Sequence, residues 1–253
     1  MQMTAGIRPF RPGMAGETAG DVAALSDICA RTPANGQDAR GVLSDDRLWG
    51  DVFAVPYAVR HPDLAFVVVT DADEPIGYVL GTDDAVAFDR WFRDEWWPSR
   101  RPAEVAADGP EAMLIRYADV RGDAGAADAG DEGAADAGGA GAGAADAGAP
   151  AWARTYPAEL HIDLLPAAQG AGWGRRLMQT FLDALREAGV PGVHLGVSTA
   201  NPGAVARPAA GLHPARGGAR HRRVRDAALT LVPGAVLLAR GRRAGARQWR
   251  GDL

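Results

Sequence analysis

The spacing of apolar residues changes once between Tyr156 and Gly189, and the change predicts a strand followed by a helix. Residues 157–165 alternate between apolar and polar side chains, which is typical of a strand. Pro166 ends the strand because proline donates no backbone hydrogen bond. From about Gly172 onward the apolar residues form one helical stripe: Leu177, Met178, Phe181, Leu182 and Leu185. Gly189 follows, where a left-handed cap closes a helix.

Three glycines at alternate positions, Gly170, Gly172 and Gly174, join the predicted strand to the predicted helix. Without β-carbons they leave backbone amides open to a ligand, and the helix adds the positive end of its dipole. Arg175 and Arg176 in the first helical turn also attract phosphate groups. A tight turn that serves only packing is the alternative, but three glycines in this context favour a site for phosphate or diphosphate.

Two common phosphate-binding motifs do not fit this turn. The dinucleotide fingerprint needs a glycine where Arg175 stands, and a P-loop needs a lysine, which this chain lacks. The run Gln169-Gly170-Ala171-Gly172-Trp173-Gly174, a Q-x-x-G-x-G pattern, instead resembles the acetyl-CoA-binding motif of the GCN5-related N-acetyltransferases, the GNAT family. The longer run HIDLLPAAQGAGWGRRLM resembles the bacterial members related to the acetyltransferase-like domain of O-GlcNAcases. The match extends from Pro157 to about Ala206.

The resemblance implies an α/β protein with the GNAT fold, in which helices flank a mixed central sheet. Two parallel central strands of that sheet splay apart and admit the pantetheine arm of acetyl-CoA, the cosubstrate. A backbone amide around Leu164–Leu165 would stabilise the oxyanion during direct transfer to an amine. The implied cofactor-binding residues are Leu164, Leu165, Gln169, Gly170, Ala171, Gly172, Trp173, Gly174, Arg175 and Asn201. Asn201 fits equally well as a helix N-cap, so both roles stay open.

The rest of the pattern predicts elements in the order of the family's N-terminal half. Strands are expected at residues 7–11, on an edge because of Pro9, and at 64–70 and 75–81, which form a hairpin. Helices are expected at 21–31 and 45–60, with Pro56 bending or dividing the second. Residues 190–199 predict a strand parallel to 157–165.

Residues 85–97 predict a helix that carries five large aromatic side chains: Phe88, Trp91, Phe92, Trp96 and Trp97. Core packing is the preferred interpretation, and a wall of the acceptor pocket is the alternative.

Composition separates a GNAT domain, residues 1–206, from two unusual segments. Residues 121–150 are mostly Ala, Gly and Asp, which predicts a disordered insertion. Residues 207–253 form a divergent, arginine-rich tail. Pro208 stands where relatives commonly carry the tyrosine that protonates the leaving thiolate, and proline would break that helix. The tail is interpreted as translated out of the ancestral frame; a nucleic-acid-binding tail is less favoured because no aromatic residues interleave its arginines.

Cys29 is the only cysteine, so the sequence predicts no intramolecular disulfide, no cysteine-based zinc site and no metal. The N-terminus lacks the pattern of a signal peptide, and no apolar run is long enough to span a bilayer. We therefore expect a cytoplasmic protein without a membrane partner. A homodimer is left open.

Glu159, His161 and Asp163 share one face of the predicted strand and are the candidates for the base that takes the amine's proton, Glu159 first. A solvated or internally paired face is the alternative, since buried charge is costly. Several relatives carry the base on the opposite register, so a bulge is left open. The sequence thus predicts an acetyl-CoA-dependent N-acetyltransferase for a small-molecule or peptide amine. The alternative is a catalytically impaired, CoA-binding regulatory module of the same fold.

Overall fold

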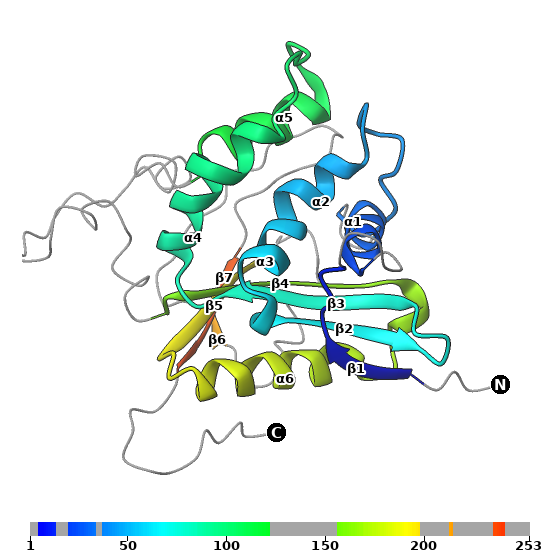
Figure 1. Ribbon diagram of the computed structural model, residues 1–253, viewed down its shortest axis with the longest axis vertical. Coiled ribbons are helices and arrows are strands. Elements are labelled where there is room, and N and C mark those ends of the chain that lie inside the picture. Colours follow the sequence, from blue (N-terminus) through cyan, green and yellow to red (C-terminus); the bar gives the residue numbers. More distant parts are fainter. Residues whose placement is uncertain are drawn as a thin grey trace, which may run out of the picture.

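The chain folds around one mixed sheet with helices on both faces, as the computed structural model shows (Figure 1). The structure describes residues 5–13, 20–33, 37–121, 156–197, 213–214 and 235–240. The strand order is β1-β2-β3-β4-β5-β7-β6, and only β4 and β5 are parallel neighbours. The strands are β1 (Ala5–Pro9), β2 (Ala65–Thr70), β3 (Pro75–Thr82), β4 (Ala158–Leu164), β5 (Gly192–Val197), β6 (His213–Pro214) and β7 (Ala235–Arg240).

The edge strand and the hairpin confirm the predictions from sequence. β1 stands at the end of the strand order, and Pro9, which has no amide hydrogen, is its last residue. β2 is the continuous apolar run, with Val67 and Val68 fully buried, and it pairs antiparallel with β3. The pairing shifts register between Val68 and Val69.

Helices cover the two faces of the sheet unequally. Figure 1 shows α6 against one face of the sheet and α1 to α5 on the opposite, five-helix face. The helices are α1 (Val22–Ala30), α2 (Arg47–Phe53), α3 (Val55–Arg60), α4 (Ala85–Trp91), α5 (Gly109–Asp119) and α6 (Trp173–Glu187). Tyr78 on β3 contacts Asp163 on β4, whereas a β-carbon at Gly81 would meet Phe181 of α6. Because side chains alternate along a strand, Glu159, His161 and Asp163 lie on the five-helix face.

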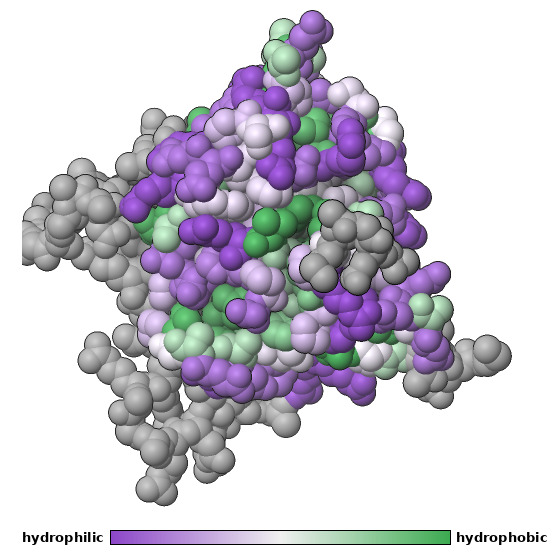
Figure 2. All heavy atoms as spheres, in the orientation of Figure 1, coloured by the Kyte–Doolittle hydropathy of each residue, from purple (hydrophilic) through white to green (hydrophobic). Residues whose placement is uncertain are grey.

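α6 confirms the amphipathic pattern that predicted it. Its apolar stripe is buried under the sheet: Leu177, Met178, Phe181, Leu182 and Leu185. Burying a Leu or Phe side chain stabilises a fold by about 1.5–3 kcal/mol, so this stripe fixes the helix in place. Its outer side is polar, as the lower edge of Figure 2 shows. Gly189, at a φ of +74°, caps the helix, and the Val190 amide donates to the Leu185 carbonyl at 2.9 Å.

Two predicted helices are interrupted. The segment 45–60 is divided, because α2 ends at Phe53 and α3 begins at Val55 with Pro56 in its first turn. The segment 85–97 begins as α4, continues as a π-helical turn over Phe92–Trp96 (η2) and ends as a 3₁₀ turn over Trp97–Ser99 (η3). Four of its aromatic side chains are buried, which agrees with the core interpretation: Phe88, Phe92, Trp96 and Trp97.

The segment before the predicted insertion differs from the prediction. α5 was not predicted, and it packs Leu114 and Ile115 into the core. The insertion was predicted to begin at Arg121, which is wrong for that residue: Arg121 is only 8% exposed and ion-paired. Residues 122–150 lie outside the described residues.

β4 and β5 part soon after they meet. They pair only through Ala158 with Val193 and Glu159 with His194, although β4 continues to Leu164 and β5 to Val197. The splayed parallel strands that the resemblance implied are therefore present.

Residues on both sides of the predicted domain boundary at 206 contribute to the sheet, since β7 pairs antiparallel with β5. The division into 1–206 and 207–253 stays a prediction. Among the described residues, no helix is long and apolar enough to cross a membrane.

Candidate functional site

The turn between β4 and α6 requires glycine at two positions. Gly170 and Gly172 have φ angles of +77° and +80°, in the left-handed region that residues with a side chain avoid. A β-carbon at either position would meet nothing within 4 Å, so conformation and not space demands glycine. Gly174 differs, because a β-carbon there would lie 3.3 Å from the Cδ1 atom of Leu164. Two glycines shape the turn, and the third lets α6 start close to β4.

The amides of this turn have no backbone partner among the described residues. Within the described part of the chain, no backbone carbonyl accepts from the N–H groups of Gly170, Ala171, Gly172, Trp173 and Gly174. The first three of these residues are also exposed. Gln169 fixes the beginning of the turn, since its Nε2 donates to the Leu164 carbonyl at 2.9 Å. A row of free amides at the start of a 15-residue helix fits a diphosphate group.

The open side of β4 carries a second row of amides. The Leu165 N–H donates to the Ile76 carbonyl at 2.9 Å, so it is turned toward β3. Backbone groups alternate along a strand, so the N–H groups of Leu160, Ile162 and Leu164 face β5. The pairing of Glu159 with His194 engages the Leu160 N–H, and β5 has departed from the N–H groups of Ile162 and Leu164. The sequence proposed the amides of Leu164 and Leu165 for the oxyanion. The Leu165 amide is already bonded to the Ile76 carbonyl, which leaves the Leu164 amide.

Trp173 and two arginines border the turn. Trp173 is half-buried and packs against the core, and the Arg176 guanidinium lies 4.7 Å from the centroid of its ring. Arg175 and Arg176 are both exposed, so their positive charges stand beside the free amides. Asn201 and Pro208, to which the sequence assigned roles, lie outside the described residues.

Glu159 is held in a network of charged groups. Its Oε2 atom accepts a hydrogen bond from the Tyr57 hydroxyl at 2.7 Å and lies 3.3 Å from Nη2 of Arg121. Arg121 also donates through Nε to Asp89 at 2.6 Å. Burial works to raise the pKa of Glu159, but Arg121, then His194 and the Tyr57 hydrogen bond outweigh it, so this pKa lies below its ordinary value. Glu159 is therefore ionised at neutral pH and only weakly basic.

His161 and Asp163 form a second pair further along β4. Nε2 of His161 lies 2.9 Å from Oδ2 of Asp163, and that oxygen also accepts from the Tyr78 hydroxyl at 2.7 Å. The His161 ring stacks on Phe53 and Tyr78, with centroid distances of 6.1 and 5.8 Å. Burial works to lower the pKa of His161, but Asp163 raises it to about 10. His161 is therefore a cation at neutral pH.

The structure brings Glu159, His161 and Asp163 to one face, and that face is internally paired. The bulge that was left open does not occur, because β3 and β4 stay in register from Thr82–Glu159 to Gly77–Leu164. The partners of these residues were missed: Tyr57, Tyr78, Arg121 and Cys29. They come from distant segments, and no pattern within the sequence signals their approach.

Comparisons with known proteins agree with this geometry. The sequence pattern of the Acetyltransferase (GNAT) family matches residues 95–207. SsHAT, known from a crystal structure, is 31% identical, with 94% of this chain and 98% of SsHAT covered and a TM-score of 0.67. The protein yncA from Salmonella typhimurium, solved with its cofactor acetyl-CoA, is 14% identical, with 96% of each chain covered and a TM-score of 0.45. Drosophila melanogaster polyamine N-acetyltransferase, which forms N-acetylagmatine, is 14% identical, with 94% of this chain and 100% of that chain covered and a TM-score of 0.47.

The splayed parallel strands and the glycine-rich turn that leads into α6 define the class of α/β fold that the resemblance implied. The family match and the 31% identity to SsHAT go further: the chain belongs to the acetyltransferase (GNAT) family. Acetyl-CoA is the cosubstrate of this family.

Proposed function

We propose that this protein is an N-acetyltransferase that moves the acetyl group of acetyl-CoA directly to an amine acceptor. The observation that carries the proposal is the continuity of two rows of free amides. One row lines the turn at residues 170–174, and the other consists of the N–H groups of Leu164 and Ile162 on the open side of β4. The first row suits a diphosphate, and the second suits the amide-bearing pantetheine arm.

The splay of the strands indicates where the thioester lies. Glu159 and Leu164 are five residues apart on an extended strand, hence about 16 Å. A thioester beside Leu164 would be out of reach of Glu159 and His161, and only Asp163 would adjoin it. The arm enters from the turn, and β4 and β5 part immediately after Glu159. We therefore place the thioester at the closed end of the gap, next to the Ile162 amide, with the Leu164 amide holding the arm.

The reaction at this place forms one C–N bond and breaks one C–S bond. The neutral amine attacks the thioester carbonyl, and the Ile162 N–H at the closed end of the gap stabilises the oxyanion. The proton that the attacking nitrogen gives up passes to the departing sulfur, so CoA leaves as the thiol. Glu159, whose side chain is 26% exposed, attracts the cationic form of the amine. Because the pKa of Glu159 is lowered, the carboxylate is a weak base. It passes to water the one proton that the cationic amine must lose before it attacks.

A CoA-binding module without catalysis is the second candidate. One observation favours it: the three candidate bases already have partners, in Tyr57 and Arg121 for Glu159 and in each other for His161 and Asp163.

The acceptor class is proposed to be a small-molecule or peptide amine. The closer resemblance to the O-GlcNAcase-linked domain, the cytoplasmic location and a homodimer remain proposals from sequence.

Calorimetric titration with acetyl-CoA and with CoA tests the cofactor site, and thiol release over a panel of amines tests transfer. Binding with amine-dependent thiol release is expected for an acetyltransferase. Binding without thiol release from any amine would identify the module instead, and no binding at all would remove both candidates.

A further inference from the structure

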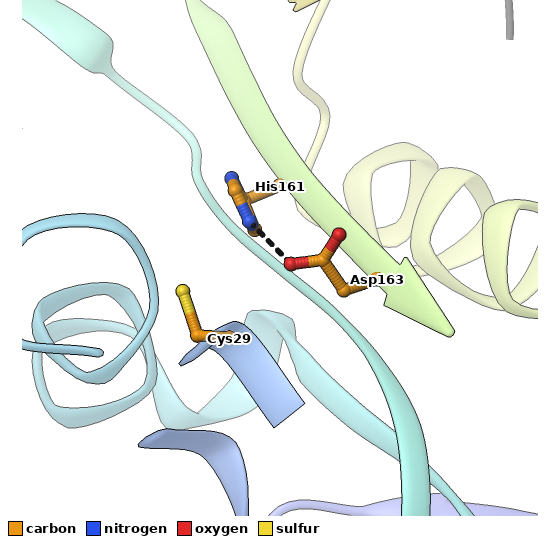
Figure 3. Close-up of side chains that lie close together, drawn as sticks. All are labelled: Cys29, His161 and Asp163. Carbon is orange, nitrogen blue, oxygen red and sulfur yellow. Dashed lines mark hydrogen bonds and ion pairs between the residues drawn. The ribbon is translucent and has the colours of Figure 1, made fainter. Parts of the chain in front are cut away.

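Three different metal-ligating side chains converge beside the proposed reaction centre (Figure 3). Cys29 comes from α1, and His161 and Asp163 come from β4. One ligand atom from each residue lies within 4.8 Å of the other two. We propose that these side chains bind one divalent transition-metal ion, for which Zn²⁺ is the best match in ligand chemistry. The proposal does not depend on acetyl transfer.

The set of donor atoms selects the kind of ion. A thiolate sulfur, an imidazole nitrogen and a carboxylate oxygen suit a borderline-soft ion such as Zn²⁺, whereas Mg²⁺ and Ca²⁺ prefer oxygen ligands alone. Three protein ligands leave one tetrahedral position for water. The single cysteine in the sequence excludes only zinc sites that need several cysteines. The fold places a histidine and a carboxylate beside this one thiol.

The distances require only a small rearrangement. Zn²⁺ holds sulfur at about 2.3 Å and nitrogen at about 2.0 Å, so tetrahedral ligand atoms lie about 3.5 Å apart. Nε2 of His161 and Oδ2 of Asp163 are already 2.9 Å apart. The Cys29 thiol donates to the Trp49 carbonyl at 3.3 Å, a weak bond that side-chain rotation can exchange for a metal–sulfur bond.

The surroundings supply an orienting partner and an entry path. The fully buried Tyr78 hydroxyl donates to Asp163 and so fixes the orientation of this carboxylate. Cys29 is 1% exposed, but the side chains of His161 and Asp163 are 30% and 20% exposed, so an ion reaches the cluster from their side. Coordination releases one proton from the thiol and one from the imidazolium. The net charge of the cluster therefore stays the same, which limits the energetic penalty of burying the ion.

The test titrates the full chain, freed of metal by a chelator, with Co²⁺ as a spectroscopic probe. Thiolate bound to Co²⁺ gives a charge-transfer band in the near ultraviolet, and Cys29 is the only source of a thiolate in this chain. We expect the band to saturate at one equivalent and to vanish when Zn²⁺ displaces Co²⁺. Cys29→Ala should abolish it, and His161→Gln should weaken the affinity at least about tenfold. His61→Gln is the matched control. Nδ1 of His61 also lies near a carboxylate, 3.6 Å from Oδ1 of Asp83, but His61 is not part of the cluster with Cys29, so the band should remain.

Absence of the band at excess Co²⁺ overturns the proposal, and so does a band that His161→Gln leaves at full affinity. Circular dichroism checks the folding of each variant. Where a variant does not fold, the unaltered chain decides: Zn²⁺ should raise its melting temperature and slow the alkylation of Cys29. If Zn²⁺ does neither, the proposal is likewise overturned. All of these readouts are independent of acetyl-CoA, so a failed metal site leaves the proposed acetyltransferase untouched.

Discussion

Replacing Gly172 with alanine tests whether the backbone conformation of the turn holds the cofactor. Gly172 precedes α6 at a φ of +80°, and a β-carbon there would meet nothing within 4 Å. The substitution therefore introduces one penalty only, the left-handed conformation, which costs an L-residue about 1–2 kcal/mol. The turn relieves this strain by rotating its peptide planes, and the rotation moves amides away from the diphosphate.

The expected loss of affinity follows from the amides that rotate. A hydrogen bond from an amide to a charged phosphate oxygen contributes about 1.5–3 kcal/mol. Losing one such bond should raise the Kd for acetyl-CoA and for CoA about tenfold to a hundredfold. Isothermal titration calorimetry measures this change, and urea denaturation should show a loss of about 1–2 kcal/mol in the free energy of unfolding.

Gly41→Ala is the matched control for this experiment. Gly41 has a φ of +76° and equally open surroundings, but it precedes α2. The control should lose a similar free energy of unfolding, about 1–2 kcal/mol, and bind acetyl-CoA as the unaltered chain does. Equal Kd values for the two variants would refute the assignment of the turn to the diphosphate.

Three further perturbations test the charged face. Arg121→Met should lower the free energy of unfolding in urea by about 3–5 kcal/mol, because it removes the buried guanidinium that pairs with two half-buried carboxylates. Arg101→Met at an exposed ion pair should leave it nearly unchanged, and equal losses would contradict the network. In metal-free protein, the protonated His161 ring stabilises the folded state through its ion pair with Asp163. This contribution to the free energy of unfolding is complete below pH 6.5, the ordinary pKa of histidine, and is lost as the pH rises through about 10, the pKa of His161 in the folded state. The melting temperature of the unaltered chain should fall between pH 6.5 and about pH 10, and that of His161→Gln should fall less. If both melting temperatures fall equally, the ion pair does not stabilise the fold. Glu159→Gln should lower kcat/KM for an amine about a hundredfold with an unchanged Kd for acetyl-CoA, and an unaltered kcat/KM removes Glu159 from the reaction.

The central unit of the fold was predictable because its signals are local. Alternation ending at Pro166 located β4, and the apolar stripe located α6. The missing side chains at Gly170 and Gly172 indicated the turn, where both residues adopt positive φ angles. Each of these features depends on residues that are close together in the sequence.

α5 was missed because its local signals conflict with its structure. It begins with Gly109 and Pro110, two residues that usually interrupt helices, although proline fits a first helical turn well. Its buried side includes two alanines, Ala112 and Ala118, so the apolar pattern is weak. Packing against the rest of the core, which the sequence does not display, stabilises this helix.

The partners of the site residues could not be predicted for a different reason. Alternation placed Glu159, His161 and Asp163 on one face, and His161 pairs there with Asp163. The Arg121 guanidinium that balances the charge of Glu159 comes from a distant segment. Arg121 pairs with both Asp89 and Glu159. It is the first residue of a run rich in Ala, Gly and Asp, and the composition of that run gives no sign that its first side chain is buried. Cys29 approaches His161 only because α1 packs across the same face of the sheet.

Amide hydrogen exchange, measured residue by residue with and without acetyl-CoA, shows directly whether the free amides of the turn and of β4 bind the cofactor. If the two rows of amides bind the cofactor, exchange should slow at residues 170–174 and at Ile162 and Leu164, while the edge strand β1 stays unchanged. Saturating acetyl-CoA that leaves these amides exchanging as in the free protein, or protects another surface instead, would contradict the account.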